Sequence, residues 1–232
     1  MPKKRLTKKE QERIAEILRR LDGQYGTDVM CSLEYKTPWQ LLIATILCAQ
    51  CTDERVNLVT KDLFRKYPSV EAFASADLEE LEQDIRPTGF YHNKAKNIIA
   101  CCRELRDTYH GEVPRRIEEL TALAGVGRKT ANVIRGNVYG DASIVVDTHV
   151  KRISGKLDFT AETDPEKIEK DLMEVLPKEN WIRINMQLIT LGREICTARS
   201  PKCECCFLAD LCPGKDRKET GKKGGRKRGS ER

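Results

Sequence analysis

A glycine-rich turn in the middle of the chain carries the residues with the clearest chemical potential: Gly125, Val126, Gly127, Arg128, Lys129 and Thr130. The turn joins two segments with helical periodicity. Glycine on both sides of Val126 permits backbone angles that other residues avoid, and it leaves N–H groups free at the start of the second helix. Together with the positive end of the helix dipole and the Arg128 guanidinium, these groups form an anion site that suits a DNA phosphate.

Lys129 distinguishes this turn from an ordinary connection between helices, for which a glycine-x-glycine sequence is also typical. The turn is not a nucleotide-binding P-loop, because Arg128 stands where that motif needs glycine before its lysine. In the first turn of a helix the dipole disfavours an ammonium ion, and burial would disfavour it further. The result would be the neutral amine that a Schiff-base nucleophile needs. A surface lysine that binds phosphate directly is the alternative interpretation.

Asp147 is a second candidate for chemistry. It follows the apolar run Ile144–Val146 and precedes Thr148 and His149. A carboxylate at the end of a buried run in a basic region could act as a general base or stabilise positive charge. The simpler interpretation is an N-cap for a helix that begins near Thr148. The two roles are compatible.

Four cysteines near the C-terminus have the spacing of a metal centre: Cys196, Cys203, Cys206 and Cys212. Four thiolates so close in sequence suit either a tetrahedral zinc ion or a [4Fe–4S] cluster, and their spacing alone leaves both open. The other cysteines show no ligand-like spacing. We expect most of them to be small packed residues, kept reduced inside the cell.

The elements that must position these residues are predicted to be helices throughout. Thr7 and Glu10 form a capping box before apolar residues at helical spacing, and Pro38 opens an apolar helix after Thr37. Only the run 144–146 has strand character, and it is too short to found a sheet. The sequence therefore predicts an all-α fold. Further helices are predicted at about 52–66, 77–85, 93–109, 115–123, 128–139, 148–156, 165–176 and 179–192.

The net charge of +6 comes from the two ends of the chain. Residues 1–9 carry +5 and residues 213–232 carry +6, so the body between them is acidic, at −5. Nucleic-acid binding must therefore depend on local features, such as the basic stretches 86–106 and 115–156 around the glycine-rich turn. The longest uncharged apolar run, 41–49, is far shorter than a membrane span, and the residues before it do not have the pattern expected of a secretory signal. We expect an intracellular protein without a membrane segment.

The hairpin Leu123–Ala131, together with the sequence around Asp147, resembles the helix-hairpin-helix signature of the DNA-glycosylase superfamily. With Lys129 present, the chain resembles the endonuclease III branch, from about Pro38 to Cys212. The resemblance implies that Lys129 is the nucleophile and that Asp147, eighteen positions on, is the catalytic carboxylate. It also implies that the cysteine loop 196–212 holds a [4Fe–4S] cluster rather than zinc.

The same resemblance implies how the chain contacts DNA. Gln50 would plug the gap left by a flipped base, and Phe90 would wedge into the opposite strand. The remaining expected DNA contacts are Gly125, Val126, Gly127, Arg128, Thr130 and His149. The chain departs from the family pattern at three positions: Cys48 replaces the usual serine, Phe90 the usual leucine, and Ala124 the usual proline.

The implied fold is a helix-hairpin-helix DNA-glycosylase fold, in which a six-helix domain over 31–141 is inserted into a cluster domain. The hairpin lies near 115–139. Residues 1–30 and 142–212 build the cluster domain, and 213–232 form a basic disordered tail.

The implied function is a bifunctional DNA glycosylase and AP lyase that removes oxidised pyrimidines through a lysine Schiff base and nicks the strand 3′ to the abasic site by β-elimination. Its partner would be double-stranded DNA with damaged bases or abasic sites, bound by a monomer. The alternatives are a monofunctional mismatch or adenine glycosylase, the latter lacking the hairpin lysine, and a non-catalytic protein that binds DNA structure.

Overall fold

The computed structural model describes residues 6–28 and 31–215. Every regular element in these two ranges is a helix, which confirms the predicted all-α fold. None of the described helices is both long and apolar enough to cross a bilayer. The α-helices are α1 (Lys8–Tyr25), α2 (Pro38–Leu47), α3 (Asp53–Lys66), α4 (Val70–Ala74), α5 (Leu78–Ile85), α6 (Tyr91–Tyr109), α7 (Ile117–Ala122), α8 (Arg128–Tyr139), α9 (Thr148–Lys156), α10 (Pro165–Val175) and α11 (Trp181–Glu194). Three short 3-10 helices join them: η1 (Arg86–Thr88), η2 (Lys178–Asn180) and η3 (Cys203–Cys205).

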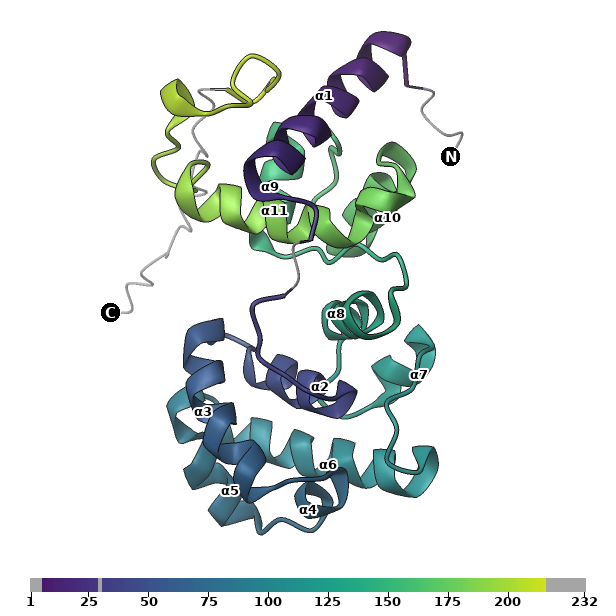
Figure 1. Ribbon diagram of the computed structural model, residues 1–232, viewed down its shortest axis with the longest axis vertical. Coiled ribbons are helices and arrows are strands. Elements are labelled where there is room, and N and C mark those ends of the chain that lie inside the picture. The colour runs from purple at the N-terminus through teal and green to yellow at the C-terminus, as the bar shows by residue number, and fades with distance from the viewer. Residues whose placement is uncertain (1–5, 29–30, 216–232) are drawn as a thin grey trace, which may run out of the picture.

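The buried apolar side chains of the described residues form two separate hydrophobic cores. The first contains the apolar faces of α2 to α8, and the second those of α1, α9, α10 and α11. In Figure 1, α1 lies beside α9 and α11 although the whole of α2 to α8 separates them in sequence, and α8 lies between the two halves. The segment from α2 to α8 is therefore an insertion into a unit built from both sides of the chain, as the predicted fold class requires.

Local sequence explains where the main helices begin. The Thr7 hydroxyl accepts from the Glu10 N–H at 3.3 Å, and the Glu10 carboxylate accepts from the Thr7 N–H at 2.7 Å, so the predicted capping box starts α1. Ile14 and Ile17 are then buried on its inner face. One described α-helix was not predicted: α4 spans only five residues after its Ser69 cap, too few for a helical periodicity to be recognised.

Candidate active site

The hairpin between α7 and α8 depends on a single glycine for its backbone. Gly125 has φ +75°, and a Cβ added there would meet the Asn97 Cβ at 2.9 Å, so both conformation and space require glycine. Gly127 has φ −89° and open space around it, so the expectation that both glycines use restricted angles is wrong for Gly127. As the N-cap of α8, Gly127 has no side chain that could accept from the first-turn N–H groups, which remain available to an anion.

Lys129 lies in the first turn of α8, as predicted, but its side chain is exposed. The protein therefore does not bury this lysine, as the alternative of a surface lysine requires. Electrostatic interactions connect Lys129 with the Cys48 thiol at the end of α2 and with the His149 imidazole in α9. The amine thus faces both halves of the molecule.

Asp147 is the N-cap of α9, as one of its two interpretations predicted. Its Oδ1 accepts a hydrogen bond from the Val150 N–H at 2.8 Å. Among the described residues, Oδ2 has no hydrogen-bond partner. One oxygen therefore fixes the carboxylate, and the other is left for a ligand.

His149 lies among positive charges beside Asp147. Burial lowers the pKa of His149; the Asp147 carboxylate raises it, and Arg152, Arg193 and Lys129 lower it further. These neighbours come from three different helices, α8, α9 and α11. The imidazole therefore lies where positive charge from both halves of the molecule converges, which favours its neutral form.

Close packing of α9 against α11 seats the His149 ring. A Cβ added at Gly192 would lie 2.3 Å from His149 Nδ1, so only glycine fits there. Arg152 Nη2 lies 3.3 Å from the same nitrogen and donates to the Cys196 carbonyl at 2.6 Å. The histidine is thereby connected to the first residue of the cysteine loop.

Gln50 and Phe90 share an unusual backbone conformation. Their φ angles are +55° and +50°, in the left-handed region that non-glycine residues seldom adopt. Both side chains are exposed, and Phe90 keeps 62% of its surface accessible. A large apolar side chain held outward at a cost in backbone strain is typical of a functional constraint.

Cys48 is the residue that replaces the family's usual serine, and its thiol forms a hydrogen bond with Asp53. Its Sγ donates to Asp53 Oδ1 at 3.3 Å, and burial together with this carboxylate raises the pKa of Cys48. The Ser32 hydroxyl also donates to Asp53, and Arg193 of α11 lies 3.8 Å from it. Sequence reasoning missed Asp53, which connects α3 to the other half of the molecule, because no local pattern marks an acid in a first helical turn as unusual.

Arg128 is paired with an acid. Its Nε donates to Glu169 Oε2 at 2.7 Å and its Nη2 to Oε1 at 3.3 Å. Asn132 Nδ2 donates to the same Oε1 at 3.0 Å, and Glu169 is buried. The positive charge expected at the anion site is therefore largely offset, and Arg128 joins α8 to α10.

All four spaced cysteines, Cys196, Cys203, Cys206 and Cys212, line the same pocket. Burial raises the pKa of the thiols of Cys196, Cys206 and Cys212, and nearby Lys156 opposes this at the first and last of them. All four donors are sulfur, and the positive charge of Lys156 favours the thiolate forms that a metal centre needs at two of them. Cys205 is exposed and does not line the pocket.

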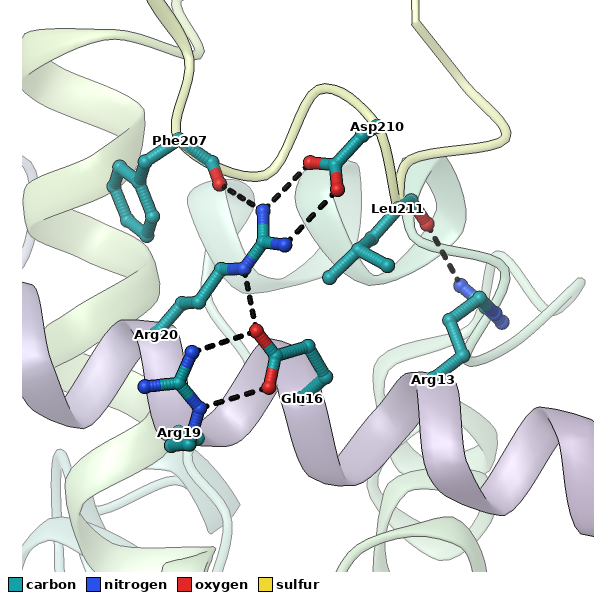
Figure 2. A network of polar contacts seen from close by, with 7 residues as sticks. All are labelled: Arg13, Glu16, Arg19, Arg20, Phe207, Asp210 and Leu211. Atoms are coloured by element: carbon teal, nitrogen blue, oxygen red, sulfur yellow. Dashed lines mark hydrogen bonds and ion pairs between the residues drawn. The ribbon is translucent and has the colours of Figure 1, made fainter.

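Helix α1 holds the cysteine loop through two arginines (Figure 2). Arg20 donates to the Phe207 carbonyl at 2.7 Å and to both oxygens of Asp210 at 2.6 and 2.9 Å. Arg13 donates to the Leu211 carbonyl at 3.2 Å. Phe207 and Leu211 each adjoin one of the spaced cysteines, so α1 fixes the loop next to its sulfurs. After the loop, Gly214 is buried against α9; residues 216–232, most of the predicted tail, and residues 1–5 lie outside the described part of the chain.

Comparisons with known proteins agree with this geometry. The family model for HhH-GPD superfamily base excision DNA repair proteins matches residues 43–178, and the model for the iron–sulfur binding domain of endonuclease III matches residues 196–212. Endonuclease III of Synechocystis sp. is 51% identical over 203 residues, which cover 87% of this chain and 92% of the relative. Endonuclease III of Bacillus subtilis is 47% identical over 183 residues, covering 78% and 84%.

Solved structures give the same result. A trapped covalent intermediate of an endonuclease III with DNA, an estranged-adenine complex, matches with a TM-score of 0.84 and 46% identity, over 91% of this chain and 99% of that one. A thermostable thymine-DNA glycosylase, at 22% identity and a TM-score of 0.78 over 89% and 96%, shares the fold. The chain therefore belongs to the endonuclease III family of helix-hairpin-helix base excision repair proteins, whose members are DNA glycosylases and AP lyases that carry a [4Fe–4S] cluster.

Proposed function

We propose that this chain removes oxidised pyrimidines from double-stranded DNA with Lys129 as the nucleophile, and that it acts as a monomer. The observation that carries the proposal is the position of the Lys129 amine, exposed at the start of α8 and near enough to His149, two residues from Asp147, for its charge to lower the pKa of that imidazole. A similar protein has been solved as a trapped covalent intermediate with DNA, which supports a covalent route.

The proposed chemistry begins when the target base leaves the helical stack, at a cost of a few kcal/mol. Gln50 fills the vacated space and Phe90 enters the opposite strand. The first-turn N–H groups of α8, next to Gly125 and Gly127, hold a phosphate and so fix the register without reading sequence. Bound DNA also excludes water from Lys129, which supplies the desolvation that the protein alone does not provide.

Lys129 Nζ then forms a bond to the sugar C1′ while the bond from C1′ to the base breaks, and the base leaves with that electron pair. The free oxygen of Asp147 stabilises the positive charge that develops on the sugar and accepts the proton that the amine loses. The nitrogen lone pair then opens the sugar ring by breaking the bond from C1′ to the ring oxygen, which gives the Schiff base. When a base removes a C2′ proton, a double bond forms between C2′ and C3′, the C3′–O bond breaks and the phosphate leaves. This β-elimination nicks the strand.

Cys196, Cys203, Cys206 and Cys212 would hold the cluster. When bound, the cluster supplies structural order to the loop and takes no part in bond making. The residues around the cluster connect the ordered loop to the rest of the protein. Arg152 donates a hydrogen bond to the Cys196 carbonyl beside His149, and α1 holds the other end of the loop (Figure 2). The loop thereby keeps α9, and with it Asp147, in a fixed position.

Borohydride reduction tests the proposal. With a duplex that contains an abasic site, we expect a covalent protein–DNA adduct, its loss in Lys129→Gln, and its retention in Lys151→Gln, a matched change at an exposed lysine of α9. Absence of an adduct with the unmodified protein would overturn the lyase assignment and favour a non-catalytic DNA binder. Duplexes with an oxidised pyrimidine, an oxidised purine or a mismatch then test the substrate class; preference for the purine or the mismatch would overturn it.

A further inference from the structure

A buried lysine outside the reaction centre connects the two loops that carry Gln50 and Phe90. Lys94 lies in the first turns of α6 and is only 4% exposed. Its Nζ donates to the Leu47 carbonyl at 2.8 Å and to the Thr88 carbonyl at 2.8 Å. Nothing in the proposed reaction uses this ammonium group.

Both acceptors are the last residues of helices. Leu47 ends α2, three residues before Gln50, and Thr88 ends η1, two residues before Phe90. Carbonyl groups at a helix C-terminus lack intrahelical partners and carry partial negative charge, so they favour a cation. The Lys94 backbone N–H also donates to the Phe90 carbonyl at 3.1 Å, which closes the turn that holds Phe90 in its left-handed conformation.

Burial has a cost at this position. Desolvation lowers the pKa of Lys94, opposed by the thiols of Cys51 and Cys48. A leucine or methionine would fill the same space without this cost, and replacing buried charges by apolar residues is often neutral or stabilising. What an apolar side chain cannot do is donate to two carbonyls on different loops at once.

We propose that Lys94 is a positioning residue that fixes the Gln50 loop relative to the Phe90 loop, so that both side chains enter the duplex at the same base step. The inference rests on the proposed roles of Gln50 and Phe90. Both residues have strained backbone angles. The ammonium group holds a carbonyl three residues before Gln50 and another two residues before Phe90, so it supports both strained turns.

A double-mutant cycle tests the inference. The readout is the stopped-flow rise in fluorescence of 2-aminopurine placed beside an oxidised pyrimidine, which reports unstacking. We expect Lys94→Met to slow this rise about tenfold, the lower end of what loss of a charge-assisted hydrogen bond produces. In a protein that already carries Gln50→Ala and Phe90→Ala, the same change slows the rise less than twofold. The matched control, Lys96→Met, removes an exposed charge from the same helix and leaves the rise unchanged.

Three outcomes are distinguishable. If Lys94→Met slows unstacking equally with and without the alanine changes, the lysine has a general structural role and the inference is overturned. The inference is also overturned if Lys94→Met lowers borohydride trapping at a preformed abasic site as much as it slows unstacking, because no base has to leave the stack there. If the two alanine changes do not slow unstacking, the proposed roles of Gln50 and Phe90 fail instead. Should Lys94→Met not fold, Lys94→Gln, which keeps one amide donor but cannot reach both carbonyls, serves in the same cycle.

Discussion

The Glu169 carboxylate offers the sharpest test of how the two halves of the molecule are joined. It accepts two hydrogen bonds from Arg128 and one from Asn132, and its side chain is 7% exposed. Removing one partner of a fully buried ion pair costs about 3–5 kcal/mol. The Arg128 side chain is 39% exposed, so water replaces part of the lost interaction. We therefore expect Glu169→Gln to lower the free energy of unfolding by about 1–3 kcal/mol.

Urea unfolding followed by tryptophan fluorescence measures this loss, because the chain has one tryptophan in each half. Trp39 packs against the first core and Trp181 against the second. The control is Glu174→Gln, an exposed acid on the same helix, for which we expect less than about 0.5 kcal/mol.

A companion variant, Arg128→Leu, completes a cycle in which the double variant is less destabilised than the sum of the two single ones. A loss below about 0.5 kcal/mol in Glu169→Gln, or strict additivity with Arg128→Leu, would refute the reasoning that this pair holds α8 to α10.

Three further predictions concern the cluster loop, the reaction centre and the chain end. Arg20→Leu removes the contact of α1 with the loop at Phe207 (Figure 2), so visible absorption of the cluster should decay faster under a chelator than in the control Arg19→Leu. Equal decay would show that this contact does not hold the loop. The pKa of His149 is lowered from 6.5, so its neutral form stabilises the fold above that pH, and the stabilisation is lost as pH falls below it. In NMR titrations, Asp147→Asn should lower this pKa further, because the carboxylate raises it; a rise would place Asp147 elsewhere. Deleting 216–232 should weaken DNA binding and flatten its salt dependence while trapping is retained; an unchanged slope would exclude a DNA clamp.

Much of the site could be predicted because its signals are local in sequence. Asp147 was expected to cap α9 from the helical pattern that follows it, and its hydrogen bond to Val150 confirms this. The spacing of the four cysteines indicated one metal centre, and they line one pocket. Gly125 needed its positive φ for the hairpin.

What could not be predicted depends on contacts between distant segments. Glu169 lies 41 residues from Arg128, and nothing around either residue in sequence marks them as partners. Lys94 sits among polar residues at the start of a helix, where a solvated surface is the ordinary expectation, and only the folded chain brings the Leu47 carbonyl to it. The exposure of Lys129 depends likewise on how α2 and α9 are arranged around α8.

The central claim is that the Lys129 amine forms the bond to the sugar, and mass spectrometry of the borohydride-reduced adduct tests it most directly. Trypsin does not cut after a modified lysine, so the account predicts that the sugar fragment is found on the peptide 129–135, with no cleavage after Lys129. A fragment on Lys94, Lys151 or any other amine, with the peptide 129–135 unmodified, would contradict it.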